Sequence, residues 1–160
     1  LHAVIVGEDR VEYDAPRPDG RTYREAALRE HDFDLSRLHF TGRLGIGEYR
    51  RVLLSSSVHV YLTYPFILSW SLLEAMAAGC TVVASDTAPV REVIKDKVNG
   101  FLADFFSPEA IAARVEEALD DRDKRQAVGQ AARASILAAY DARDLLPRQV
   151  ALLKAAAGGR

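Results

Sequence analysis

Short apolar runs alternate with longer amphipathic stretches along the chain. Apolar runs ended by glycine or polar residues predict strands covered on both faces, at residues 3–6, 38–41, 58–62, 81–84 and 101–103. Stretches with an apolar stripe predict helices, at residues 23–31, 48–56, 69–78, 89–95, 108–119, 123–139 and 145–157. This alternation predicts an α/β fold, with a doubly wound parallel sheet of about five or six strands and extra C-terminal helices.

The composition is that of one ordinary soluble domain over residues 1–160. Of the 160 residues, 49% are hydrophobic and 28% are charged, and the formal net charge is -2. No block of lysine or arginine is present, which argues against nucleic acid or an anionic membrane surface as a partner. The single cysteine, Cys80, excludes an intrachain disulfide and favours a reducing compartment, so we expect a cytoplasmic location. Because Leu1 is not an initiator methionine and a strand follows at once, we expect a piece of a longer protein.

The most informative position is Glu74, a carboxylate among leucine and alanine residues in the helix predicted at 69–78. A buried carboxylate without partners costs several kcal/mol, so Glu74 is predicted to contact a partner or a ligand in a cleft. At the carboxyl ends of parallel strands, the first turn of a helix offers free N–H groups to an anion. A ribose diphosphate would satisfy both groups. A structural carboxylate, paired to an arginine such as Arg91, is an equally open alternative.

Other common sites find little support in the sequence. Gly7 is followed by Glu8 and Asp9 instead of the glycines of a dinucleotide site, and residues 42–47 match no known phosphate loop. The histidines lack zinc-ligand spacing, so we expect no metal and no other cofactor. The rival from another class is a non-catalytic nucleotide-binding or signalling module, similar to a phospho-accepting receiver. The strand at 58–62 ends without the aspartate that a receiver needs.

Several segments, taken in order, resemble the C-terminal half of a family 4 (group 1) retaining glycosyltransferase of GT-B fold. They cover nearly the whole chain, at residues 4–7, 38–42, 73–79, 82–85, 91–94 and 99–102. The resemblance implies a Rossmann-like donor-binding domain that binds a nucleoside diphosphate sugar, such as a UDP or GDP sugar. It also implies transfer of a hexosyl group with retention in the complete protein. A sugar-nucleotide epimerase has a similar two-domain architecture but should lack the string at 74–79.

The resemblance also implies a missing N-terminal acceptor domain, which would carry the cations that clamp the diphosphate. The fragment alone should therefore be inactive, and any peripheral membrane association would belong to the missing half. Within this chain the resemblance implies that Glu74 holds the ribose hydroxyls and that Arg43 and Leu44 lie beside the base. The diphosphate and the donor sugar are implied to bind at Ser69, Trp70, Ser71 and Leu72.

One departure from the family pattern changes the expected site. The family has a first glutamate eight positions before the second, and Phe66 stands there in this chain. Residues 67–69, Ile-Leu-Ser, replace the Gly-Phe-Gly that follows it. A carboxylate near the anomeric carbon is thus absent, so the catalytic residue is unknown and either sugar recognition or the transfer step differs.

Overall fold

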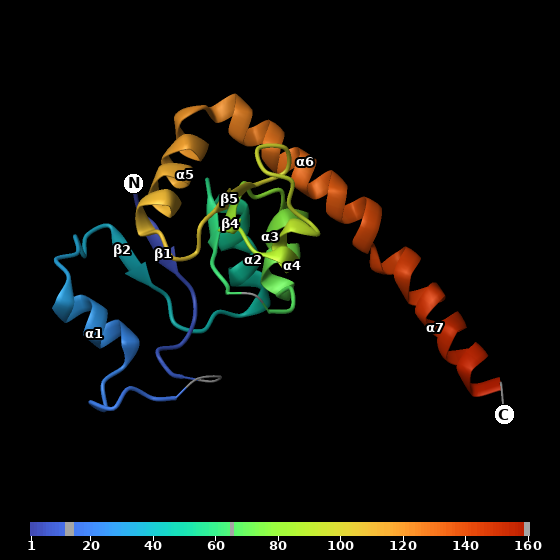
Figure 1. The fold of residues 1–160 in the computed structure, drawn as a ribbon, viewed down its shortest axis with the longest axis horizontal. Coiled ribbons are helices and arrows are strands. Elements are labelled where there is room, and N and C mark those ends of the chain that lie inside the picture. The colour runs from blue at the N-terminus through green and yellow to red at the C-terminus, as the bar shows by residue number, and fades with distance from the viewer. Residues whose placement is uncertain (12–14, 65, 159–160) are drawn as a thin grey trace. The chain divides into compact units, whose positions relative to one another are not determined.

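The computed structural model describes residues 1–11, 15–64 and 66–158 (Figure 1). Contacts divide the chain into two compact units, Leu1–Arg51 and Val52–Arg160. Five strands are assigned in the described ranges, all paired in parallel, which confirms the predicted parallel α/β class. They form a two-stranded sheet in the first unit and a three-stranded sheet in the second, where the sequence pattern predicted a single sheet.

The first unit holds β1 (Ala3–Ile5), α1 (Tyr23–Glu30) and β2 (Leu38–Phe40). Helix α1 begins with a capping box, because Thr22 accepts a hydrogen bond from the Glu25 N–H and the Glu25 side chain accepts one from the Thr22 N–H. The Arg24 guanidinium lies 3.8 Å from the centre of the Phe40 ring, which ties the helix to β2.

Strand β1 is exposed along its whole length, although its apolar run predicted cover on both faces. The physical reason is that few apolar side chains of this unit pack against its strands. Ala26 is the one residue of α1 that is buried, so the helix gives the two strands little apolar cover.

The second unit is built on β3 (His59–Tyr61), β4 (Val82–Ser85) and β5 (Phe101–Ala103), in the order β3-β4-β5. All four residues of the central strand β4 are buried. Its Val83 joins a core cluster with Phe101 and Ala103 from β5, Ala118 from α5 (Pro108–Asp120) and Val128 from α6 (Arg122–Tyr140). The short strands are therefore held by helix packing on their side chains.

Helix α3 (Trp70–Ala78) packs against α6. Gly79 ends α3 in the left-handed region at φ 82°, and a Cβ placed on Gly129 of α6 would lie 2.3 Å from the Gly79 carbonyl oxygen. Arg133 of α6 donates to the carbonyl of Ala77, and Thr81 donates to the carbonyl of Arg125 at 2.6 Å. These contacts fix the C-terminal end of α3 in the unit.

Helix α5 is tied to its surroundings through one carboxylate, Glu117. Its oxygens lie 2.9 Å from Lys97 Nζ, 2.7 Å from Arg114 Nη1 and 3.3 Å from Lys124 Nζ. Hydrogen bonds from Lys97 and then Arg114 lower the pKa of Glu117 to about 2. The carboxylate of Glu117 therefore joins α5 to α6 and to the loop that contains Lys97.

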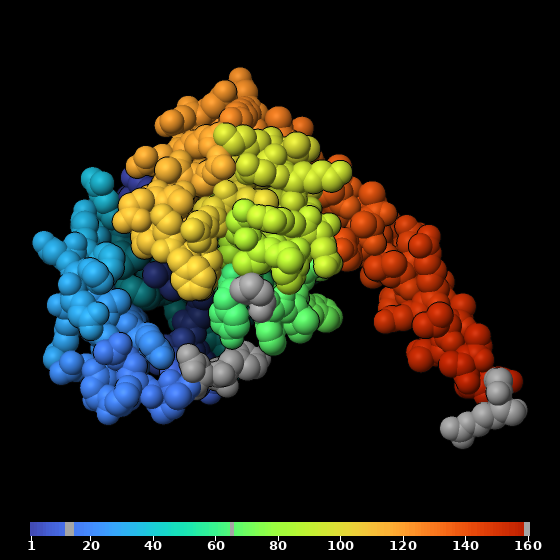
Figure 2. All heavy atoms as spheres, viewed as in Figure 1, coloured from blue at the N-terminus to red at the C-terminus, as the bar shows by residue number. Residues whose placement is uncertain are grey.

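The remaining helices are α2 (Ile46–Ser55), α4 (Ala88–Arg91) and α7 (Ala142–Gly158). Every residue of α7 is exposed, including Leu146, Val150 and Leu153. Figure 2 shows one side of this helix, in red, open to solvent. Among the described residues, no helix has the length and apolar character needed to cross a membrane.

Candidate functional site

The start of α3 lies after β3, on the carboxyl side of the three-stranded sheet. Ser69 caps the helix, since its Oγ accepts from the Ser71 N–H at 3.2 Å and lies 2.8 Å from Ser71 Oγ. The Ser69 N–H donates to the Tyr61 hydroxyl at 3.3 Å. The first turn of this helix presents backbone N–H groups and the positive end of the helix dipole, which suits an anion.

Glu74 lies on the exposed face of α3, one turn after Trp70. Residues four apart on a helix share a face, and the buried face here is formed by Leu72, Ala75 and Met76. The premise that Glu74 is desolvated is therefore wrong for this chain. No described residue bonds to its carboxylate, so it is open to a ligand from solvent.

Arg91 is not the partner of Glu74, which removes the structural alternative that the sequence left open. Its Nε and Nη2 donate to the two carboxylate oxygens of Asp86 at 2.5 and 2.7 Å. This hydrogen-bonded guanidinium holds the pKa of the Asp86 carboxyl below its usual range. The pair lies just after β4, at the same end of the sheet as the start of α3.

The loop between β3 and α3 presents large apolar side chains. Tyr64, Phe66 and Ile67 are exposed, and the rings of Tyr64 and Phe66 lie 6.4 Å apart between centroids. Trp70, the first residue of α3, is 84% exposed. An exposed aromatic segment of this kind is a candidate contact site for a ligand or a partner.

Sequence reasoning missed two polar side chains beneath this loop. The Tyr61 hydroxyl bonds Ser69, as above, and Ser85 Oγ accepts from the Thr63 N–H at 2.7 Å. They hold the loop to the carboxyl ends of β3 and β4. A residue with a hydroxyl group at the last position of each of these two strands was the signal that could have found them.

The two positions predicted to lie beside a nucleotide base belong to the first unit. Arg43 is exposed and Leu44 is half-buried, in the loop that leaves β2 through Gly42 at φ 67°. The structure brings together Ser69, Trp70, Ser71, Leu72 and Glu74 on one helix, with Leu72 fully buried in the core.

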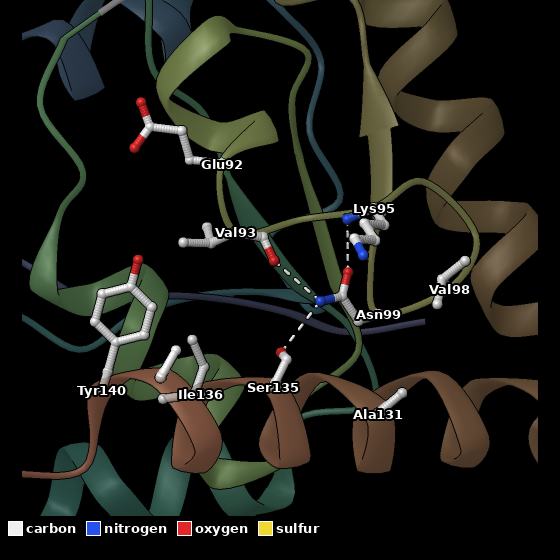
Figure 3. Close-up of a pocket in the computed structure, with 10 residues that line it drawn as sticks. Glu92, Val93, Lys95, Val98, Asn99, Ala131, Ser135, Ile136 and Tyr140 are labelled. Atoms are coloured by element: carbon white, nitrogen blue, oxygen red, sulfur yellow. Dashed lines mark hydrogen bonds between the residues drawn. The ribbon is translucent and has the colours of Figure 1, made fainter. Parts of the chain in front are cut away.

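A separate cleft of about 310 Å³ opens between the segment after α4 and the helix α6 (Figure 3). At its base the buried Asn99 amide donates to the Val93 carbonyl at 2.9 Å and to Ser135 Oγ at 3.1 Å, and accepts from the Lys95 N–H. The cleft contains none of the residues predicted to bind a donor. The hydrogen bonds at its base join the segment after α4 to α6.

A sequence model described as "Glycosyl transferases group 1" matches residues 1–135. The chain belongs to this glycosyltransferase family. It is 30% identical over 97 residues to an uncharacterized glycosyltransferase of Methanocaldococcus jannaschii, which covers 60% of this chain and 25% of that protein. The chain thus spans about a quarter of the length of that relative. A receiver-like signalling module is not favoured.

Solved structures of other glycosyltransferases show the same fold. Anabaena HepE in complex with UDP superposes with a TM-score of 0.81 at 20% identity, over 97% of this chain and 41% of HepE. Sucrose-phosphate synthase from Thermosynechococcus elongatus gives 0.78 at 22% identity, over 98% of this chain and 39% of that enzyme. The Rossmann-like half of a GT-B fold is therefore confirmed for the chain.

Proposed function

We propose that this chain is the donor-binding domain of a retaining glycosyltransferase that transfers a glycosyl group from a nucleoside diphosphate sugar. The observation that carries the proposal is the open carboxylate of Glu74, one turn after the first residue of a capped helix at the carboxyl end of a parallel sheet. A solved structure of similar fold, HepE, was determined with UDP, which supports a nucleoside diphosphate as the ligand class.

In this proposal the N–H groups at the start of α3 and the carboxylate of Glu74 have separate roles. The N–H groups at the start of α3 bind the diphosphate and stabilise the negative charge that grows on it as the glycosidic bond breaks. Glu74 accepts hydrogen bonds from the ribose hydroxyls and so positions the nucleotide. No metal is needed for either task.

The charge pattern indicates that cations for the diphosphate must come from outside residues 52–90. Residues 52–90 contain Glu74 and Asp86 but no lysine or arginine, and Arg91 is paired with Asp86. Helix amides alone stabilise a diphosphate only weakly in water, since a helix end carries about half an elementary charge. We propose that a preceding acceptor-binding domain supplies the cations and that the complete protein acts in the cytoplasm.

Calorimetric titration of the complete protein with UDP and GDP tests the role of Glu74. Two hydrogen bonds to a charged group are lost in Glu74→Ala, so we expect the Kd of the preferred nucleotide to rise at least about 100-fold. Glu116→Ala removes an exposed glutamate from α5 and should leave the Kd unchanged. Equal affinity of the Glu74→Ala protein and the wild type would overturn the proposal.

A further inference from the structure

The cleft between the segment after α4 and helix α6 has the size of a ligand site. Its volume of about 310 Å³ is at the lower end of the range for small-molecule pockets, about 300–1,000 Å³. One side carries Val93 and Val98, and the other carries Ile136 and Tyr140 of α6 (Figure 3). A cleft of this volume suits a ligand of one or two rings.

The polar groups at the base of the cleft are already bonded within the protein. The Asn99 amide nitrogen donates to the Val93 carbonyl and to Ser135 Oγ. The amide oxygen accepts from the Lys95 N–H, and Ser135 Oγ donates to a carbonyl of α6 at 2.7 Å. Val93 and Ile136 are 8% and 6% exposed, so they add apolar surface at the same depth. A ligand would therefore find apolar carbon at the base and hydrogen-bond partners at the rim.

The rim of the cleft carries three polar side chains of mixed chemistry. The Glu92 carboxylate accepts hydrogen bonds, the Lys95 ammonium donates them, and the Tyr140 hydroxyl does both. Among the residues that the structure describes, none bonds to any of these three groups. Because one negative and one positive charge cancel, the rim has no net charge. It offers free donors and acceptors to a polar, uncharged ligand.

Tyr140 adds an aromatic ring, 41% exposed, at the end of α6. Figure 3 shows its hydroxyl directed toward the side of the cleft that carries Glu92. The face of an aromatic ring is negative, so it attracts the weakly positive hydrogens of C–H groups. An exposed ring near a carboxylate therefore suits a molecule with C–H groups on its face and hydroxyl groups at its edge.

We propose that this cleft binds an uncharged sugar ring and is a glycan site separate from the donor site. The C–H face of a pyranose packs on Tyr140 and on the apolar base, and its hydroxyl groups donate to Glu92 and accept from Lys95. A diphosphate is disfavoured, because Glu92 offsets the single cation. An amino acid could pair with both charges, but ion pairs of exposed groups contribute little in water. The site requires no nucleotide, so this inference goes beyond the proposed function.

Titration of the complete protein with sugars, followed by saturation-transfer NMR, tests the inference. The probes are the methyl α-glycosides of glucose, galactose, mannose and N-acetylglucosamine, with UDP and GDP added to occupy the donor site. We expect at least one glycoside to bind, with a Kd that the nucleotides do not change. Glycine, titrated in parallel, represents zwitterionic ligands and should not bind. No binding of any glycoside would overturn the inference.

Variants of the rim locate the bound sugar. Tyr140→Ala removes the ring and should raise the Kd about fivefold or more, whereas Tyr140→Phe keeps the ring and should retain most of the affinity. Glu92→Gln should raise the Kd about fivefold, because charge-assisted hydrogen bonds are about twice as strong as neutral ones. The matched controls are Tyr23→Ala in the first unit and Glu116→Gln in α5, which remove an exposed ring and an exposed charge and should change nothing.

The Glu92 variant keeps the test independent of folding, since no described residue bonds to that carboxylate. An equal Kd in the wild type, Tyr140→Ala and Glu92→Gln would place the sugar at another site and overturn the inference. Glycine binding that Glu92→Gln abolishes would assign the cleft to zwitterions and also overturn it. The nucleotide affinity of Glu74→Ala tests only the proposed function, so the two can fail separately.

Discussion

Ser69 has two connected roles at the residue scale, because its side chain caps α3 and its backbone lies at the proposed diphosphate site. Aspartate caps helices about as well as serine. It would, however, place a negative charge where the diphosphate is proposed to bind. The two roles can therefore be separated by one substitution.

We expect Ser69→Asp to keep the melting temperature within a few degrees of the wild type but to weaken UDP or GDP binding at least about tenfold, since one repulsion of about 1.4 kcal/mol has this effect. Ser69→Ala should show the opposite pattern, with about 1 kcal/mol lower stability and little change in nucleotide affinity. Thermal unfolding and calorimetry on both variants measure these quantities. Unchanged affinity in Ser69→Asp would place the diphosphate elsewhere.

The sequence predicts the helix that carries the candidate donor-binding residues, but it does not predict their exposure. The pattern located α3 and its carboxylate, yet it treated Glu74 as buried because its sequence neighbours are apolar. On a helix the relevant neighbours are three and four positions away, and Trp70 shares the open face with Glu74. An exposed tryptophan does not reveal itself in composition, since indole side chains are usually well buried.

At the scale of elements, the docking of α3 on α6 depends on the close approach of two backbones. A Cβ on Gly129 would come within 2.3 Å of the Gly79 oxygen, closer than any real Cβ contact. The Gly79 oxygen belongs to the backbone, so a larger side chain cannot be accommodated by a rotamer change. Helix α6 would have to move outward.

We expect Gly129→Ala to lower the unfolding free energy by about 1–3 kcal/mol, in the range of overpacked sites. Gly47→Ala in α2 is the matched control, because nothing lies within 4 Å of its added Cβ. This control should be neutral or stabilise by up to about 1 kcal/mol. Urea denaturation of both variants measures the difference, and equal stabilities would contradict the described packing.

Element boundaries followed from local signals where these are strong. Helix α5 begins at Pro108, where the sequence predicts a helix over residues 108–119, and Ser107 caps it, with Oγ accepting from the Ala110 N–H at 3.1 Å. The exposure of β1 and the division into two sheets could not be predicted in this way. They depend on how much apolar area distant elements bring to each strand, and the run at residues 3–6 carries no information on that.

At the scale of the whole molecule, Glu117 links the stability of the second unit to pH. Its pKa is lowered from 4.5 to about 2 by Lys97 and Arg114, although the side chain is 29% exposed. Because the pKa of the folded state is below that of the unfolded state, the ionised carboxylate stabilises the fold above pH 4.5. This contribution is lost as the pH falls from 4.5 toward 2.

We expect Glu117→Gln to be less stable than the wild type at pH 7 and to lose less stability between pH 4.5 and pH 2. Asp141, whose pKa Arg143 also lowers to about 2, keeps some pH dependence in both proteins. Glu116→Gln, which removes an exposed charge from the same helix, should follow the wild-type curve. Parallel curves for wild type and Glu117→Gln would refute the linkage.

Trp70 is the single indole in these 160 residues, and 84% of it faces solvent. Its emission should therefore resemble that of a fully hydrated fluorophore, with strong quenching by iodide or acrylamide. A sugar seated on the ring would shift the emission to shorter wavelength and shield it from the quencher, whereas a free nucleotide would alter it less. The chain thus contains a built-in optical probe that can screen candidate donors without any label.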